Sequence, residues 1–188
     1  MKNKIEGDIV ECGVWRGGSM MATAYRLMHL KASRMLYLFD TFDGMSPASS
    51  EDVSIIGENA KSYLDLKKKT EDDTMWAYAP IERVKENLYG TQYPKDKIHF
   101  IKGKVENTLP HKKLKKIAIL RLDTDWYNST LHELETLFPL LVKGGVLIID
   151  DYGHWQGARK AVDEYIKRKK VKIFLNRVDY TCRLAIKQ

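Results

Sequence analysis

Two aliphatic runs that each end on acidic residues constrain the fold of this sequence most strongly. Residues 145–149 run into Asp150 and Asp151, and residues 117–122 run into Asp123. One helical segment separates the runs, which predicts a strand, a crossover helix and a second, parallel strand. Such units are right-handed and place both carboxyl strand ends at one edge of the sheet. Because neighbouring strands lie about 4.8 Å apart, we expect the three acids to converge.

Three converging carboxylates predict a cation site. Carboxylates this close repel one another and cannot all stay ionised without a counter-charge. Oxygen ligands suit a hard divalent cation such as Mg²⁺, so Asp123, Asp150 and Asp151 are the candidate metal ligands. The alternative is an accidental structural cluster that holds no ion.

The length of 188 residues predicts a single domain, 1–188, with a core of ordinary size. No apolar run approaches the roughly 20 residues of a spanning helix, and no signal-peptide core follows the N-terminus, so we expect a cytoplasmic protein and no membrane partner.

The two cysteines, Cys12 and Cys182, are interpreted as buried apolar side chains. The net charge of +7 comes from short lysine runs without aromatic interleaving, which argues against nucleic acid as a partner.

The N-terminal part predicts a strand, a glycine-rich turn and a helix. Residues 8–13 form the strand, and residues 20–30 have helical spacing with Met21, Ala24, Tyr25 and Met28 on the expected buried face. The glycines between them allow a ligand to approach the backbone, and the helix offers free N–H groups. The spacing Gly13-x-x-x-Gly17-Gly18 differs from the G-x-G-x-x-G of pyrophosphate sites, so this turn alone is a weak signal.

A second predicted strand, residues 35–40, ends on Asp40. An acid at this position of a doubly wound sheet can accept hydrogen bonds from both hydroxyls of a ribose. The alternative is that Asp40 only caps the turn before Gly44. The position of the acid does not distinguish one nucleoside from another.

The stretch 45–79 has few clean periods and gives the least structural information. It predicts a short helix within 59–69 and, with the next helix, makes 45–90 a lid-like insertion near the active edge of the sheet. The next helix begins at Pro80, has Ile81, Val84 and Leu88 on one face, and stops at Gly90. Residues 98–101 are the third predicted strand.

The C-terminal part completes the alternation. A helix is predicted from about Asn128, with a capping box made by Thr130 and Glu133 and a kink or an end at Pro139. Another helix covers 156–168, and the segments 172–178 and 181–187 predict a closing hairpin that turns at Asp179-Tyr180. The fold class is therefore α/β, with a mostly parallel sheet, helices on both faces and an antiparallel edge.

Four motifs occur together in order: ECGVWRGGS at 11–19, FDTFDG at 39–44, LRLDTDWY at 120–127 and IDDYGH at 149–154. With these motifs the chain resembles the macrocin O-methyltransferase family, from about Gly7 to Arg183. That family consists of class I S-adenosylmethionine enzymes that methylate sugar hydroxyls. The resemblance implies a Rossmann-like sheet of seven strands whose last strand is antiparallel. It also implies an N-terminal segment ahead of the first strand, whereas here the first predicted strand begins near residue 8.

The resemblance implies a role for residues of each motif. Asp40 would bind the ribose hydroxyls, Phe42 would lie near the adenosine, and Gly103, Lys104 and Val105 would border the adenine. The remaining residues implied to bind S-adenosylmethionine are Glu11, Gly13, Trp15, Ser19 and Asp123. Asp123, Asp150 and Asp151 match the metal ligands of the family, and Asp125 matches a proposed general base.

The resemblance thus implies transfer of a methyl group to a hydroxyl of a small molecule, such as a sugar or another diol of a natural product, assisted by Mg²⁺. A rival base is His154, because an unperturbed imidazole titrates near neutrality. Trp126, Tyr127, Tyr152 and Trp155 could form a sugar-stacking wall or could be core aromatics. The other functions left open are a nicotinamide-dependent oxidoreductase and a retired remnant that binds a nucleoside or a partner. A homo-oligomer is a further possibility.

Overall fold

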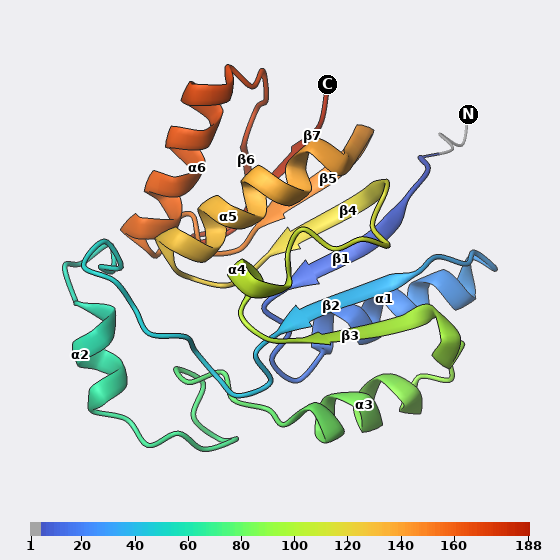
Figure 1. Ribbon diagram of the computed structural model, residues 1–188, viewed down its shortest axis with the longest axis horizontal. Helices are drawn as coiled ribbons and strands as arrows, with labels where there is room; N and C mark the ends of the chain where they lie inside the picture. The colour runs from blue at the N-terminus through green and yellow to red at the C-terminus, as the bar shows by residue number, and fades with distance from the viewer. Residues whose placement is uncertain (1–4) are drawn as a thin grey trace.

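A single seven-stranded sheet organises the computed structural model, which describes residues 5–188 (Figure 1). The strand order is β3-β2-β1-β4-β5-β7-β6, in which the first five strands are parallel and β7 runs antiparallel to both β5 and β6. The strands are β1 Asp8–Cys12, β2 Leu36–Asp40, β3 Ile98–Lys102, β4 Ile117–Leu122, β5 Leu141–Ile149, β6 Asn176–Arg177 and β7 Arg183–Ile186. The expected sheet, with its antiparallel C-terminal strands, is confirmed.

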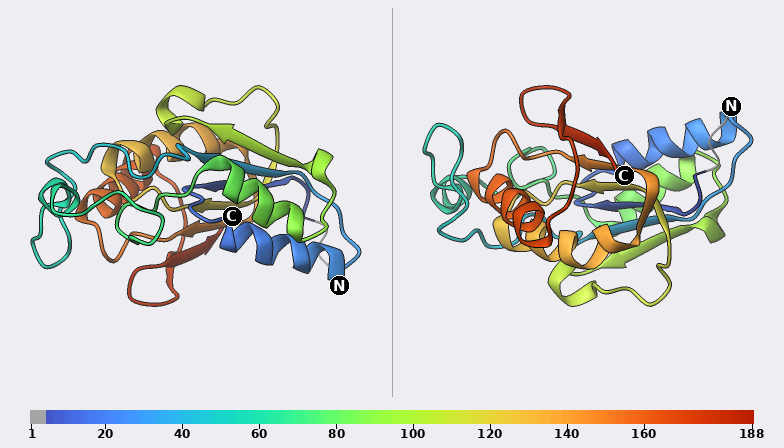
Figure 2. Two further views of the ribbon diagram at one scale, coloured as in Figure 1. Left: turned by 90° about the horizontal axis from the view of Figure 1, so that it is seen from below. Right: turned by 90° about the horizontal axis from the view of Figure 1, so that it is seen from above.

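Helices cover both faces of the sheet (Figure 2). They are α1 Gly18–His29, α2 Ala60–Asp65, α3 Ile81–Gly90, α4 Val105–Thr108, α5 Tyr127–Leu137 and α6 Gln156–Lys169, with 3-10 turns at Lys95–Lys97 and Phe138–Leu140. No helix in the described part of the chain is long and apolar enough to cross a membrane.

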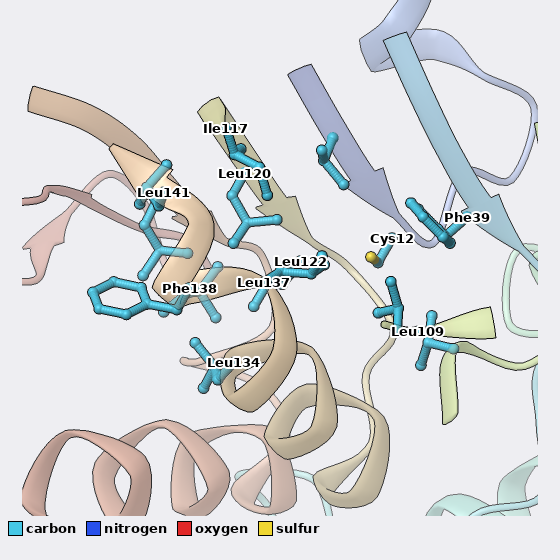
Figure 3. Packing of buried hydrophobic residues seen from close by; sticks show 14 of the residues in the cluster. Cys12, Phe39, Leu109, Ile117, Leu120, Leu122, Leu134, Leu137, Phe138 and Leu141 are labelled. Carbon is cyan, nitrogen blue, oxygen red and sulfur yellow. The ribbon is translucent and has the colours of Figure 1, made fainter. Parts of the chain in front are cut away.

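Alternate residues of the parallel strands supply the two cores. On β1, Val10 and Cys12 belong to the cluster that packs on α5 and α6, whereas Ile9 belongs to the cluster that packs on α1 and α3. Figure 3 shows the first cluster, in which Leu134 and Leu137 of α5 pack with the β4 leucines. Burial on both faces explains why these strands read as continuous aliphatic runs.

One local prediction about a helix is wrong in part and another is wrong. In α1, Ala24 is buried as expected and Met21 and Met28 are partly buried, whereas Tyr25 is 55% exposed. The inward face is centred on Met20, Ala24 and Leu27. In α5 the helix begins at Tyr127 and has no capping box: Thr130 lies inside the helix, and Glu133 accepts a hydrogen bond from the Thr124 hydroxyl. A distant residue, Asp52, takes the capping role.

Two strand boundaries also differ from the prediction. Strand β5 begins at Leu141 and not at Gly145, since a register irregularity lets Leu141 pair with Ile117 while Val146 pairs with Ile119. Gly144 permits this irregularity with a φ of 79°. In the tail, only Asn176–Arg177 and Arg183–Ile186 of the two expected segments form strands.

The residues that follow β2 lie beyond the carboxyl ends of the parallel strands (Figures 1 and 2). Helix α2 packs there through Ala60 and Leu64 against Trp126, Trp155 and Ala158, which belong to the starts of α5 and α6. Backbone bonds from Ile55 N–H to the His154 carbonyl and from Gln156 N–H to the Val53 carbonyl add to this attachment. The insertion therefore stands next to the edge of the sheet at which the acids converge.

Candidate active site

A half-open cavity of about 260 Å³ lies at the carboxyl edge of the sheet. Most of the residues implied to bind cofactor or metal line it, as does the candidate base Asp125: Gly13, Trp15, Asp40, Gly103, Lys104, Val105, Asp123, Asp150 and Asp151. Four candidate residues do not line it, namely Glu11, Ser19, Phe42 and His154. The loops after β1, β2, β3, β4 and β5 thus meet at one site, as expected for parallel strands.

The loops after β1 and β4 touch at Gly13. This glycine has a φ of 79°, and a Cβ added to it would lie 1.8 Å from the carbonyl oxygen of Asp123. The Gly13 N–H donates to the Phe39 carbonyl and the Asp123 N–H to the Cys12 carbonyl. No side chain fits between the two loops, so Gly13 allows them to pack in direct backbone contact at the cavity wall.

Asp40 ties the first two loops together. Its Oδ2 accepts the N–H groups of Val14 at 2.6 Å and Trp15 at 3.1 Å, and its Oδ1 accepts the Phe42 N–H at 2.6 Å. Burial raises the pKa of this carboxyl, and the three N–H donors oppose that shift. Phe42 itself is 3% exposed and packs against Phe100. The capping interpretation of Asp40 is therefore realised here, and a ribose-binding role remains a prediction.

Glu11 lies behind the cavity wall, where it is 1% exposed. Its Oε1 accepts a hydrogen bond from Arg121 Nη1 at 2.8 Å, and its Oε2 has no partner among the described residues. Burial raises the pKa of Glu11 to about 7, although the Arg121 charge opposes the shift. A buried carboxylate oxygen without a partner suits a cationic ligand group, such as the ammonium of an amino-acid cofactor.

The three strand-end acids form the expected cluster. Asp123, Asp150 and Asp151 each offer one carboxylate oxygen, and these oxygens lie within 4.8 Å of one another. Burial, followed by the charge of Asp151, raises the pKa of Asp123 to about 9. Three oxygen donors that resist ionisation together fit a divalent cation, which would lower the cost of their negative charge.

Asp125 is held in a fixed orientation beside this cluster. Its backbone adopts a φ of 64°, its N–H donates to Asp151 Oδ2 at 3.0 Å, and its Oδ1 accepts the Trp155 indole N–H at 2.7 Å. Burial, followed by the charge of Asp123, raises the pKa of Asp125 to about 7. A carboxylate with a pKa near neutrality can accept a proton during catalysis.

His154 is placed differently from Asp125. Its Nδ1 lies 3.0 Å from the Tyr180 hydroxyl, and its ring packs edge-on against Trp155. Of the aromatic residues near the acids, Trp126 and Trp155 pack in the core at 5.1 Å between ring centroids. The hydroxyls of Tyr127 and Tyr152 bond Glu164 and Asp163. None of these four aromatics lines the cavity, which favours the core interpretation.

The sequence did not indicate several residues of the site. Arg121 bonds Glu11, Asp123 and Asp150, but a single arginine in an aliphatic run carries no motif signal of its own. The insertion contributes Met45, Ser46, Thr74 and Ala77 to the cavity wall. These residues lie in the stretch without periodicity, so only the fold could bring them to the site.

The sheet order, its antiparallel β7 and the acid-lined cavity at its carboxyl edge define the class I methyltransferase fold. A family model described as Macrocin-O-methyltransferase (TylF) matches residues 1–186. The chain therefore belongs to the macrocin O-methyltransferase family.

Relatives and solved structures agree with this membership. The chain is 32% identical to the 8-demethyl-8-(2,3-dimethoxy-alpha-L-rhamnosyl)-tetracenomycin-C 4'-O-methyltransferase of Streptomyces olivaceus, over 94% of this chain and 64% of that protein. It is 29% identical to the mycinamicin III 3''-O-methyltransferase of Micromonospora griseorubida, over 89% of this chain and 63% of that protein. The chain thus spans less than two thirds of the length of these relatives.

Among solved structures, the O-methyltransferase NovP superposes with a TM-score of 0.82 at 28% identity, over 99% of this chain and 74% of that one. The calicheamicin methyltransferase CalS11 superposes with a TM-score of 0.71 at 19% identity, over 97% of this chain and 72% of that one, and supports the fold alone.

Proposed function

We propose that this protein is an S-adenosylmethionine-dependent O-methyltransferase that requires a divalent cation and methylates a hydroxyl of a small molecule. One observation carries the proposal: the three carboxylates within 4.8 Å lie on the same cavity as Gly13, Asp40 and Val105. A nicotinamide-dependent oxidoreductase has no use for three clustered acids at this edge. Family membership supports methyl transfer as the reaction.

In this proposal, different residues of the cavity wall bind different parts of the cofactor and the cation. Gly103, Lys104 and Val105 would hold the adenine, and the backbone beside Gly13 would border the rest of the cofactor. The Oε2 of Glu11, which has no hydrogen-bond partner among residues 5–188, would attract the ammonium of the amino-acid part. When bound, the cofactor would supply the electrophilic methyl group, and Asp123, Asp150 and Asp151 would hold a cation that would make the acceptor hydroxyl more acidic.

In the same proposal the reaction forms one C–O bond, breaks one C–S bond and releases the hydroxyl proton. Asp125 receives this proton at Oδ2, because its Oδ1 already accepts the Trp155 indole N–H. The fixed orientation of Asp125 places the base beside the metal ligands with no need to reorganise. The enclosing residues of the insertion reduce the access of water to this point.

We further propose that the acceptor is a sugar hydroxyl of a natural product. One relative is named as the 4'-O-methyltransferase of a rhamnosyl-bearing tetracenomycin C, and another as the 3''-O-methyltransferase of mycinamicin III. The insertion supplies both polar and apolar surface to the acceptor side, through Ser46, Thr74, Met45 and Ala77. This mixture suits a ring with hydroxyls on one side and carbon atoms on the other.

The test combines binding with turnover. S-adenosylhomocysteine is titrated calorimetrically into the protein with Mg²⁺ and with chelator, and methyl transfer to glycosides with free adjacent hydroxyls is then assayed. We expect binding, and turnover only with the cation. Asp150→Asn should abolish cation-dependent turnover while circular dichroism stays unchanged, and Asp163→Asn, on the exposed side of α6, is the matched control. Retained turnover in the first variant would exclude the metal assignment, and absence of cofactor binding would favour a retired remnant.

A further inference from the structure

Arg121 occupies a position that no part of the proposed reaction uses. It is the fifth residue of β4, between the buried Leu120 and Leu122, and it stands directly opposite Glu11 of β1 in the sheet register. Its side chain is 20% exposed. An arginine in the middle of an otherwise aliphatic parallel strand needs strong partners to offset its removal from water.

The partners of Arg121 are all acids of the active site. Nη1 lies 2.8 Å from Glu11 Oε1 and 2.6 Å from Asp123 Oδ2, and Nη2 lies 3.0 Å from Asp150 Oδ1. The guanidinium thus joins the carboxylate behind the cofactor wall to two of the three candidate metal ligands. Within residues 5–188, Arg121 is the one cation that forms ion pairs with this group of acids.

The count of charges shows why this cation matters. Five acids, Glu11, Asp123, Asp125, Asp150 and Asp151, lie together at the edge of the sheet, and Arg121 forms ion pairs with three of them. The acids nevertheless lie together without a divalent ion, because Arg121 supplies a counter-charge that the protein itself carries.

A divalent cation would meet Arg121 at the same carboxylates. Asp123 and Asp150 would have to turn toward the ion, and two positive charges would then share a partly buried site where water screens them poorly. Because the guanidinium of Arg121 and the ion would contact the same carboxylates, their positive charges would repel each other, and this repulsion reduces the affinity for the ion.

We propose that Arg121 is the resident counter-ion of the acid cluster and that a divalent cation competes with it for Asp123 and Asp150, so that the ion binds as an exchangeable ligand. This inference rests on the proposed metal site, and it concerns the state of that site before the ion arrives. The acids keep their positions when no ion is bound. The preassembled site raises the affinity for the ion, whereas repulsion by the Arg121 charge lowers it.

The experiment compares Mg²⁺ binding in three proteins. Calorimetric titration with Mg²⁺ and thermal unfolding in chelator and in Mg²⁺ are measured for the wild type, for Arg121→Met and for Arg168→Met. The last is a matched control, since Arg168 pairs with Glu135 on the surface. We expect Arg121→Met to bind Mg²⁺ roughly tenfold or more tightly, to unfold at a lower temperature in chelator, and to gain more from Mg²⁺ than the wild type does. Arg168→Met should bind Mg²⁺ as the wild type does.

Unchanged or weaker Mg²⁺ binding in Arg121→Met would overturn the proposal, because it would show that Arg121 orients the ligands and does not compete with the ion. A variant that folds only in the presence of Mg²⁺ would support it. If Arg121→Met does not fold under either condition, Glu11→Gln decides. With one acid fewer, Arg121 interacts more strongly with Asp123 and Asp150, and Mg²⁺ binding should weaken by about threefold or more; equal or tighter binding would contradict the proposal.

The outcomes separate this inference from the proposed function. A wild type that binds Mg²⁺ and S-adenosylhomocysteine, with no change in Arg121→Met, would refute the competition alone. A wild type and variants that all fail to bind Mg²⁺ would refute the metal site and the competition together. Absence of methyl transfer with normal Mg²⁺ binding would refute the proposed reaction and leave the competition standing.

Discussion

Asp52 caps helix α5 from a loop 75 residues earlier in the sequence: its Oδ1 accepts the backbone N–H of Tyr127 over 2.7 Å. The other oxygen of Asp52 accepts the N–H and the hydroxyl of Ser49 at 2.6 and 2.7 Å, and the residue is 1% exposed. The helix that follows the acids of β4 therefore depends on the insertion for its first hydrogen bond.

Asp52→Ala should destabilise the protein by about 2 kcal/mol, because it removes a helix cap and leaves the partly buried N–H groups of Ser49 and Tyr127 without an acceptor. Asp52→Asn, which keeps one acceptor oxygen, should lose less. Urea unfolding measures both changes. The control is Glu51→Ala, which removes an exposed partner of Lys160 and should change the free energy of unfolding by at most about 0.5 kcal/mol. Equal effects of Asp52→Ala and Glu51→Ala would contradict the capping role.

The choice between the two candidate bases can be made by kinetics. Asp125→Asn keeps the shape of the side chain but cannot accept the acceptor proton, so kcat should fall about 10²- to 10⁴-fold. S-adenosylhomocysteine affinity should stay within about threefold of the wild type. His154→Ala should leave kcat within about threefold of the wild-type value, since His154 does not line the cavity. The reverse pattern would make His154 the base.

The stability of the metal-free protein should fall as the pH rises. Glu11 has an ordinary pKa of 4.5, which burial raises to about 7 in the folded protein, and Asp125 rises from 3.8 to about 7. Between these values the folded state holds protons that the unfolded state has released, so raising the pH favours unfolding. The melting temperature in chelator should therefore decrease from about pH 5 to about pH 8.

Saturating Mg²⁺ should reduce or reverse this decrease, because the ion binds the deprotonated carboxylates. The Asp125→Asn variant should show a shallower decrease in chelator, since it removes one of the groups that titrate. Thermal unfolding followed by circular dichroism measures both. A melting temperature that rises with pH in chelator would show that the acid cluster is ionised in the metal-free protein.

Gly13→Ala should weaken cofactor binding. The added Cβ would lie 1.8 Å from the Asp123 carbonyl oxygen, so the loops after β1 and β4 would have to separate. We expect S-adenosylhomocysteine affinity to fall roughly tenfold or more in calorimetry. Gly18→Ala is the matched control from the same turn, because a Cβ at Gly18 meets no atom within 4 Å and lies in a helix. An unaffected Gly13→Ala variant would mean that the cofactor does not use this backbone.

The alternation of strands and helices could be predicted from the sequence because the central parallel strands β1, β2 and β4 are buried on both faces. A strand such as 117–122 then needs aliphatic residues at nearly every position, and the acids that follow it mark its end. The convergence of Asp123 and Asp150 followed from the geometry of parallel strands alone. These parts of the fold depend on local pattern and on general rules of sheet topology.

The parts that could not be predicted depend on contacts between distant residues. The cap of α5 is supplied by Asp52, so the local signal of Thr130 and Glu133 was misleading. Arg121 gives no signal until β1 and β5 bring Glu11 and Asp150 to it. The insertion has no regular hydrophobic periodicity, because different residues along it face the cavity, the starts of α5 and α6, or solvent.

The two halves of the insertion, around Asp52 and from residue 66 onward, are attached to the rest of the protein by different contacts. Residues near Asp52 are fixed by buried hydrogen bonds to the starts of α5 and α6. The later residues are attached at Met75 and Trp76, which pack on the cluster around α2, and by the Met45 N–H bond to the Trp76 carbonyl. Before Thr74, they contact the body mainly through exposed ion pairs such as Lys69 with Asp43 and Arg16 with Asp72, and exposed pairs contribute little to stability. A library of variants confined to residues 66–74 would therefore change the surface offered to the acceptor while the fold and the acid cluster persist.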